Sequence, residues 1–404
     1  PSVVQNHNLS VIGGTKTVNY NISLGYVNNP GMIYYTDYQR YQLRSNINVN
    51  IKPWLSVGTD LFGYIDKNNP SSENAAAGGD VIFGSGAFNT VPGMTLYDPA
   101  TGLYGGIQNP EEENVSNFNP YRRQWFYKTE YPTKTKRSVI KLHASVSPIK
   151  GLTIKGAFSY NYWERNVEHH LTDRDLFRFT FDGPVLIREG VVRTYIRRYN
   201  YKNTFRSSEL TAQYKFNVNK LDATIFAGMS QEYNKYDTDF FIKYDLVDPS
   251  LGAIDAGMTN GNITGNYNEW AMRSYFGRIN LNWDNRYLLE ANLRADGSSK
   301  FAPENRWGYF PSAAVAWRIS SEKFMEKTQN WLDDLKIRFS YGTAGNNNIP
   351  ADQTSPVWSS GSTTWLNQFP SYWTSGIASG QSGSYASNPD LKWETTVTRN
   401  VGLD

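Results

Sequence analysis

The chain has 404 residues, of which 39% are hydrophobic and 15% aromatic, and its mean hydropathy is −0.57. The 40 basic and 37 acidic residues leave a net charge of +3, spread along the chain, which argues against nucleic acid as the main partner. Cysteine is absent, which excludes disulfides and thiol catalysis, and no apolar run reaches the about 18 residues of a transmembrane helix.

The first predicted elements are runs in which apolar and polar residues alternate. Successive side chains of a strand point to opposite faces, so each run predicts a strand with one apolar and one polar face. Such runs occupy residues 7–13, 18–26, 41–51 and 55–65, and the short segments GGTKT and IKPW join them in pairs. The alternation then stops from Lys67 to about Lys136, where Gly, Asn, Pro and Ser predict a long loop.

The middle of the chain repeats this arrangement of short and long connections. Alternating runs cover residues 140–146, 154–162, 210–216 and 221–229, with the short connections SPIKGL and NVNK within the pairs. Long excursions are expected from Trp163 to about Asn203 and from Tyr233 to about Asn268. The connections are therefore alternately short and long.

Four consecutive runs near the end have the most regular alternation, at residues 275–283, 287–296, 313–319 and 335–341. One face is apolar and is expected to meet lipid; it comprises Ile279, Leu281, Leu289, Leu293, Val315, Ile337 and Phe339. The other face is charged or polar and is expected to meet a lumen; it comprises Arg278, Glu290, Asn292, Arg294, Asp296, Lys336 and Arg338. These residues could contact a protein segment inside the lumen, line a substrate path, or hold neighbouring strands together.

The pattern as a whole favours an all-β transmembrane antiparallel β-barrel with long extracellular loops and short periplasmic turns. Its strands approach the ~10 residues needed to cross a membrane, and one face of each is apolar. We count about thirteen strands, fewer than the ~22 of a plugged transporter barrel, so residues 1–404 are expected to form part of a barrel. A soluble sandwich also alternates, but its polar face meets bulk water.

Aromatic residues mark two further candidate regions. Trp54, Trp283, Tyr287 and Trp331 lie at the short-turn ends and are expected to form an interfacial girdle. A final long loop, from Gly345 to Leu391, carries Trp358, Trp365, Phe369, Tyr372 and Trp373. These rings could stack on a substrate, bind a protein partner, or pack on one another.

No catalytic, cofactor or metal motif is present in a supporting context. His169 and His170 are adjacent, and adjacent strand residues point apart, so they make a poor shared metal site. We therefore expect a protein that performs no covalent chemistry.

Four stretches carry a family resemblance. RADGSSKF (residues 294–301), RWGYFPSAAVAWRISSEKF (306–324), WLDDLKIRFSYGTAGNNNI (331–349) and NPDLKWETTVTRNVGLD (388–404) resemble the barrel of SusC/RagA-type TonB-linked outer-membrane transporters. SVIGGTKTVNYNISLGY (10–26) is similar to the strand pair that opens much of that barrel. The motifs occur in the family's order and span nearly the whole chain.

The resemblance implies a Gram-negative, Bacteroidetes-like outer-membrane importer of oligosaccharides or peptides. It further implies a barrel of ~22 strands, an N-terminal plug, a TonB-contacting segment and a SusD-like surface lipoprotein over the mouth. The plug, the TonB-contacting segment and the closing strands are expected to lie outside these residues, in a larger protein. Two alternatives remain: a passive porin, and a secreted carbohydrate-binding or carbohydrate-cleaving β-protein.

Overall fold

The computed structural model describes most of the chain. The described residues are 3–31, 36–69, 95, 97–105, 107–108, 115–116, 133–171, 176–180, 182–188, 194–248, 251–328, 330–350, 357–360, 372–373, 377–378, 381–385 and 388–404. Among them, no helix has the length and hydropathy needed to span a bilayer.

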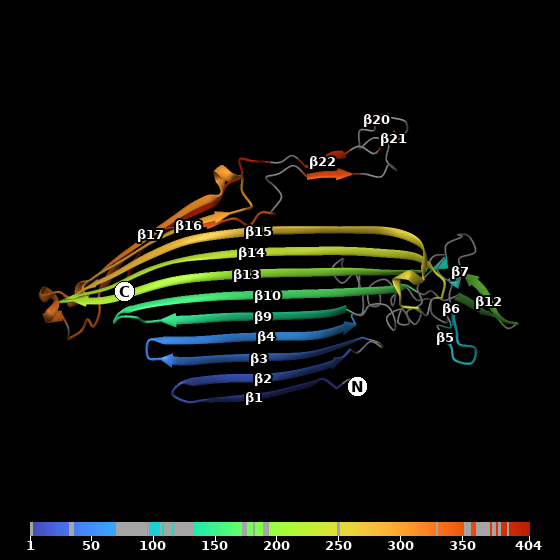
Figure 1. Ribbon diagram of the computed structural model, residues 1–404, viewed down its shortest axis with the longest axis horizontal. Coiled ribbons are helices and arrows are strands. Elements are labelled where there is room, and N and C mark those ends of the chain that lie inside the picture. The colour runs from blue at the N-terminus through green and yellow to red at the C-terminus, as the bar shows by residue number, and fades with distance from the viewer. Residues whose placement is uncertain are drawn as a thin grey trace.

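A single large antiparallel sheet dominates the molecule (Figure 1). Its strands are β1 (Gln5–Gly14), β2 (Val18–Pro30), β3 (Asp37–Lys52), β4 (Leu55–Asn69), β9 (Thr133–Val146), β10 (Leu152–Leu171), β13 (Tyr195–Val218), β14 (Leu221–Leu246), β15 (Gly257–Trp283), β16 (Tyr287–Ser298), β17 (Trp307–Arg318), β18 (Lys336–Asn346) and β23 (Glu394–Leu403). In the described residues these thirteen strands follow one another in chain order, and each pairs with the next. The predicted strand number and antiparallel meander are confirmed.

Smaller elements occupy the connections. The short strands are β5 (Tyr97–Asp98), β6 (Leu103–Gly105), β7 (Ile107–Gln108), β8 (Val115–Ser116), β11 (Leu176–Thr180), β12 (Gly183–Arg188), β19 (Val357–Ser360), β20 (Tyr372–Trp373), β21 (Ile377–Ala378) and β22 (Gln381–Tyr385). The 3₁₀ helices are η3 (Ile254–Ala256), η4 (Pro303–Asn305), η5 (Ile319–Ser321) and η6 (Lys323–Thr328). The tight turns gather at one end of the sheet, and β5 to β8, β11 and β12 lie at the other (Figure 1).

The apolar residues of the main sheet form a continuous belt on one face. Register pairs Leu281 with Leu289, Leu289 with Val315, and Val315 with Phe339, so these side chains form one row across β15 to β18. They do not enter a core: Phe339 remains 52% exposed. A sheet that leaves such a belt open on one face matches a wall that buries it in lipid.

The belt has a height comparable with the apolar band of a membrane barrel. On β15 it runs from Tyr275 to Trp283, roughly 27 Å along the strand at ~3.4 Å per residue, and a strand tilt of about 40° would make this roughly 20 Å of height. The apolar band of outer-membrane barrels is about 25 Å tall. The apolar residues of the alternating runs therefore form a belt of about the height that a membrane requires.

The short-turn ends of the strands are staggered across the sheet. Following the register from β2 through β3, β4, β9 and β10, Val18 lies level with Leu210 in the interior of β13, rather than with Val218 at its end. Strands that are tilted against a barrel axis produce such a stagger. The chain thus forms part of a transmembrane antiparallel β-barrel.

Two predicted excursions are much shorter than expected. β10 continues to Leu171 and β13 begins at Tyr195, whereas the sequence predicted a loop from Trp163 to about Asn203. β14 and β15 likewise extend through the predicted loop from Tyr233 to about Asn268. Alternation ceases there because both faces of a strand can be polar beyond the lipid, while the backbone ladder continues.

The extended part of the sheet has a small core of its own. Ile196 of β13, Leu246 of β14 and Ala256 of η3 are buried together, with Ile254 packed against them. The extensions are therefore folded structure that raises the sheet above the belt on the long-loop side.

Candidate functional site

The polar face of β15 to β18 carries the residues expected to face a lumen. Asn292 Nδ2 donates hydrogen bonds to Glu290 Oε1 at 2.9 Å and to Ser312 Oγ on the next strand at 3.3 Å. Register places Arg278 opposite Asn292. These predicted residues share one face and lie in one group.

Arg294 and Asp296 form a second, tighter group. Arg294 Nε donates to both carboxylate oxygens of Asp296 at 2.8 and 2.7 Å, and its Nη2 donates to Ser274 Oγ at 3.0 Å. Asp296 is 6% exposed and Ser274 is buried. The buried carboxylate of Asp296 holds the Arg294 guanidinium, and that guanidinium reaches across to the Ser274 hydroxyl, so the group links β16 to β15.

Arginine–aromatic stacking continues along the polar face. The Arg294 guanidinium lies 5.5 Å from the ring centre of Phe276, and that of Arg278 lies 5.5 Å from Phe226. The rings of Phe226 and Phe276 stack at 5.8 Å. The face therefore presents planar cations and rings as well as hydrogen-bonding groups.

A similar arrangement on β3 and β4 is not predicted by the sequence analysis. Arg40 lies 4.1 Å from the ring centre of Tyr64, and Arg44 lies 5.4 Å from that of Phe62. Arg44 and Phe62 are directly opposite in register. The sequence does contain a sign of this arrangement. By alternation, the arginines of β3 and the aromatic residues of β4 lie on the same face of two strands that a tight turn joins.

Lys336 and Arg338 belong to a separate group at the short-turn end. Lys336 Nζ lies 2.7 Å from Asp404 Oδ2, and Arg338 Nη2 lies 3.2 Å from Asp404 Oδ1. The predicted lumen residues thus share one face but not one site.

The RADGSSKF motif builds the rim at the long-loop end. Phe301 and Phe310 are 1% and 7% exposed, and both pack against the ring of Trp393, at 5.5 and 5.3 Å between ring centres. Trp393 Nε1 also donates to the Arg306 carbonyl oxygen at 2.8 Å. An added Cβ at Gly308 would lie 2.5 Å from Phe310 and 2.9 Å from Trp393, so glycine leaves the space that these rings fill.

The same rim holds both ends of the final long loop. Asn347 Nδ2 donates to Ser298 Oγ at 3.2 Å, and Lys300 Nζ donates to the Asn347 carbonyl oxygen at 3.4 Å. Asn346 Nδ2 donates to Glu394 Oε2 at 2.9 Å on the returning strand. The loop therefore leaves and re-enters the sheet at its long-loop end.

The five aromatic residues expected to bind ligand or cap lie in this loop. Trp358 belongs to β19, and Tyr372 and Trp373 belong to β20. Their side chains, like Trp365 and Phe369 as a whole, lie outside the described residues.

The predicted girdle residues lie at the short-turn end and are exposed. They are Trp54, Trp283, Tyr287 and Trp331, the last in the connection between β17 and β18 rather than in a strand. The Tyr287 hydroxyl donates to Glu322 at 2.7 Å and Trp317 Nε1 donates at 3.1 Å. Both hydrogen bonds lower the pKa of the Glu322 carboxyl, and the bond from Tyr287 has the larger effect.

A second group of aromatic residues, not predicted from the sequence, lies at the other margin of the belt. Tyr275 and Trp307 stack at 6.0 Å between ring centres, and Tyr309 is exposed beside them on β17. Two aromatic margins bracket the belt, as expected for two membrane–water interfaces.

His169 and His170 lie in the extension of β10, beyond the belt. Burial lowers the pKa of His169 to about 4, and its Nδ1 accepts from Arg197 Nη2 at 2.8 Å. His170 belongs to the opposite face by alternation. Within the described part of the chain, no three His, Asp or Glu side chains come together as a metal site.

Comparisons with known proteins agree with this architecture. The family model described as TonB dependent receptor-like, beta-barrel matches residues 65–404. TonB-dependent receptor P26 of Formosa agariphila is 27% identical over 421 residues, covering 100% of this chain and 38% of that protein. TonB-dependent receptor SusC of Bacteroides thetaiotaomicron is 27% identical over 419 residues, covering 100% of this chain and 39% of that protein.

A solved structure, that of the RagAB peptide transporter, has the same fold. It matches with a TM-score of 0.77 and 25% sequence identity, covering 99% of this chain and 42% of that one. The chain therefore spans about two fifths of the length of the relatives that it matches.

Proposed function

We propose a function from one premise: this chain belongs to the TonB-dependent receptor-like β-barrel family. The proposed function is energised import across the outer membrane of a Gram-negative, Bacteroidetes-like bacterium. The chain itself would serve as barrel wall and mouth, and it would perform no covalent chemistry.

The observation that carries the proposal is the pair of unlike faces on one continuous sheet. The apolar belt suits lipid, and the opposite face holds Arg, Glu, Asn and Asp side chains in separate hydrogen-bonded groups. In lipid every backbone polar group must be paired, and a closed antiparallel barrel achieves this.

We propose that residues 1–404 form part of a barrel that further strands complete. In the described residues β1 and β23 each have one paired neighbour in the sheet, so each offers an edge to another strand. An N-terminal plug is proposed to occupy the lumen. Arg278, Arg294 and the aromatic rings beneath them are proposed to contact that plug or to line the substrate path.

The proposed substrate class is oligosaccharides or peptides, and the proposed partner is a SusD-like surface lipoprotein. The names of two relatives support these choices: one is SusC, and the other is the RagAB peptide transporter. We further propose that the tight turns are periplasmic and the long loops extracellular, because outer-membrane barrels have short periplasmic turns. The loop ends held at Ser298 and Trp393 would then lie at the mouth.

Uptake in living cells tests the proposal. The full-length protein would be expressed as the only uptake route for labelled oligosaccharides of mixed composition or labelled oligopeptides, in a strain that lacks its own uptake systems for them. We expect uptake of one class that stops when TonB is deleted or the proton gradient is dissipated. Uptake that continues in either case would indicate a passive porin, and an absence of uptake of both classes would contradict the proposed substrate class.

The same assay tests the final loop. Replacing Trp358, Trp365 and Trp373 by Ala should weaken capture of ligand or of the surface lipoprotein, because each lost stacking contact costs on the order of 1 kcal/mol. Replacing the girdle residue Trp331 by Ala provides the matched control at the other end of the sheet. If the triple variant imports and retains its partner as the wild type does, the loop has no role in binding.

A further inference from the structure

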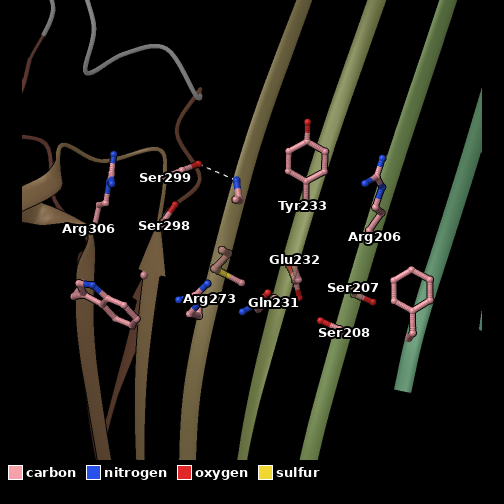
Figure 2. A pocket seen from close by; sticks show the side chains of 15 residues that line it. Arg206, Ser207, Ser208, Gln231, Glu232, Tyr233, Arg273, Ser298, Ser299 and Arg306 are labelled. Atoms are coloured by element: carbon pink, nitrogen blue, oxygen red, sulfur yellow. Dashed lines mark hydrogen bonds between the residues drawn. The ribbon is translucent and has the colours of Figure 1, made fainter. Parts of the chain in front are cut away.

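A pocket on the lipid-facing side of the sheet contains several arginines. Its volume is about 440 Å³, and its walls come from β10 and from β13 to β17 (Figure 2). One register row crosses it, in which Ser208 pairs with Gln231, Gln231 with Arg273, and Arg273 with Gly297. Phe158 and Trp307 stand at the two ends of this row.

The pocket lies where the apolar belt ends on three neighbouring strands. On β14 the outward residues are apolar from Leu221 to Met229, and Gln231 follows. On β15 they are apolar from Trp283 back to Tyr275, and Arg273 follows. On β13 Ser208 occupies the corresponding place, and Arg206 is the next outward residue, opposite Tyr233. The arginines therefore face outward immediately beyond the belt, on the long-loop side.

The guanidinium groups are held in place but not neutralised. With the Gln231 amide turned so that its oxygen faces β15, that oxygen accepts from Arg273 Nε at 3.1 Å and Nη2 at 3.2 Å. The Arg206 guanidinium lies 5.6 Å from the ring centre of Tyr233. Arg306 Nε donates to the Phe301 carbonyl oxygen at 3.2 Å.

The nearby carboxylates, Glu232 and Glu269, are outnumbered by the three arginines. Among the described residues, none of the three guanidinium groups makes an ion pair. The Glu269 carboxylate accepts the hydroxyl of Tyr233 at 2.7 Å and offsets part of the charge of the arginines. Glu232 also lines the pocket, although by alternation with Gln231 and Tyr233 on β14 its side chain belongs to the opposite, polar face. The outward pocket has a net positive charge.

We propose that this pocket binds the phosphorylated headgroup of an outer-leaflet lipid whose acyl chains lie along the belt below. Arginine matches phosphate oxygens with paired, charge-assisted hydrogen bonds, and basic side chains beside a membrane attract anionic lipid. Trp307 and Tyr233 supply the amphipathic rings that favour the headgroup level. The inference rests on the proposed orientation, with the long loops outside the cell, and is independent of the imported substrate.

Lipid binding to the full-length protein tests the proposal. The protein in non-ionic detergent would be titrated with monophosphoryl lipid A and, separately, with the same lipid after phosphate removal, and bound lipid would be counted by native mass spectrometry. The test variant is Arg206→Gln with Arg273→Gln. The matched control is Lys136→Gln, an exposed outward residue beyond the belt of β9 whose charge faces Glu164.

We expect the phosphorylated lipid to bind at least about tenfold more tightly than the dephosphorylated one, the scale of a charge-assisted contact. The double variant should lose this preference, Lys136→Gln should keep it, and Arg273→Lys should keep part of it. Equal binding of both lipids to the wild type, or an unchanged preference in a folded double variant, would overturn the proposal. Displacement of the lipid by inorganic phosphate at matching concentration would also overturn it, in favour of a free-phosphate site.

Folding is checked independently, because a folded barrel migrates faster than an unfolded one on an unheated gel. If the double variant does not fold, the comparison of the two lipids on the wild type and on Arg273→Lys decides. Uptake is not part of this readout, so failure of the import proposal and failure of the lipid proposal remain distinguishable.

Discussion

A Leu293→Lys substitution should destabilise the folded barrel by about 2–4 kcal/mol, the cost of a lysine near the middle of the bilayer on the lipid face. Leu293 is 55% exposed on the apolar face of β16, between the two aromatic margins of the belt. An ammonium group there has no water and no partner in lipid. The change in free energy of unfolding would be measured by urea titration of the full-length protein in liposomes.

The neighbouring position supplies the control. Asn292→Lys places the same side chain one residue away, on the polar face, beside Glu290. Its cost should be much smaller, because an ammonium group can pair with that carboxylate and with water. Equal costs at 292 and 293 would show that the two faces do not differ in environment, contrary to the proposed membrane placement.

A Phe301→Ala substitution should destabilise the rim by about 3–5 kcal/mol, the usual cost of removing a fully buried aromatic side chain. Phe301 is 1% exposed, and its ring packs against Trp393, which is bonded to the Arg306 carbonyl. Loss of this ring should loosen both ends of the final loop before the belt is affected. Hydrogen exchange would then rise at residues 298–306 and 388–394 and stay unchanged at the belt residues of β15.

Tyr309→Ala is the control for the rim. Tyr309 is 66% exposed and points outward from β17, so its removal should leave exchange at the rim unchanged. If Phe301→Ala leaves exchange at residues 388–394 unchanged as well, the aromatic cluster does not hold the loop.

The strand alternation was readable from the sequence because its period is two and its environment is uniform. Leu289 and Glu290 must lie on opposite faces of any strand, and a belt of lipid selects leucine at one parity throughout. The predicted lipid and lumen faces follow from this rule. Beyond the belt neither face meets lipid, so apolar residues are no longer selected on one face, while the backbone pairing continues. For this reason the alternation did not predict the extensions of β10 to Leu171 and of β14 to Leu246.

The rim was not readable in the same way. Phe301 in the connection between β16 and β17, and Phe310 on β17, meet Trp393, which lies far along the chain just before β23. Their contact depends on glycine at position 308. The alternation within one strand does not predict a contact with a distant segment of the chain. The arginine pocket escaped for a related reason: Arg206 and Arg273 become neighbours through the register of β13, β14 and β15.

The central claim is that one face of this sheet meets lipid and the other meets a water-filled lumen. Residues 1–404 contain no cysteine, so in the full-length protein, with any cysteine elsewhere replaced, single cysteines placed from position 287 to 296 on β16 can each carry a nitroxide label in bilayers. Collision rates with dissolved oxygen, which concentrates in lipid, and with a water-soluble nickel chelate would be measured at each position. We predict high oxygen accessibility at 289, 291 and 293 and high nickel accessibility at 290, 292 and 294. Nickel accessibility that is equally high at both sets of positions, or equally low at both, would contradict the account.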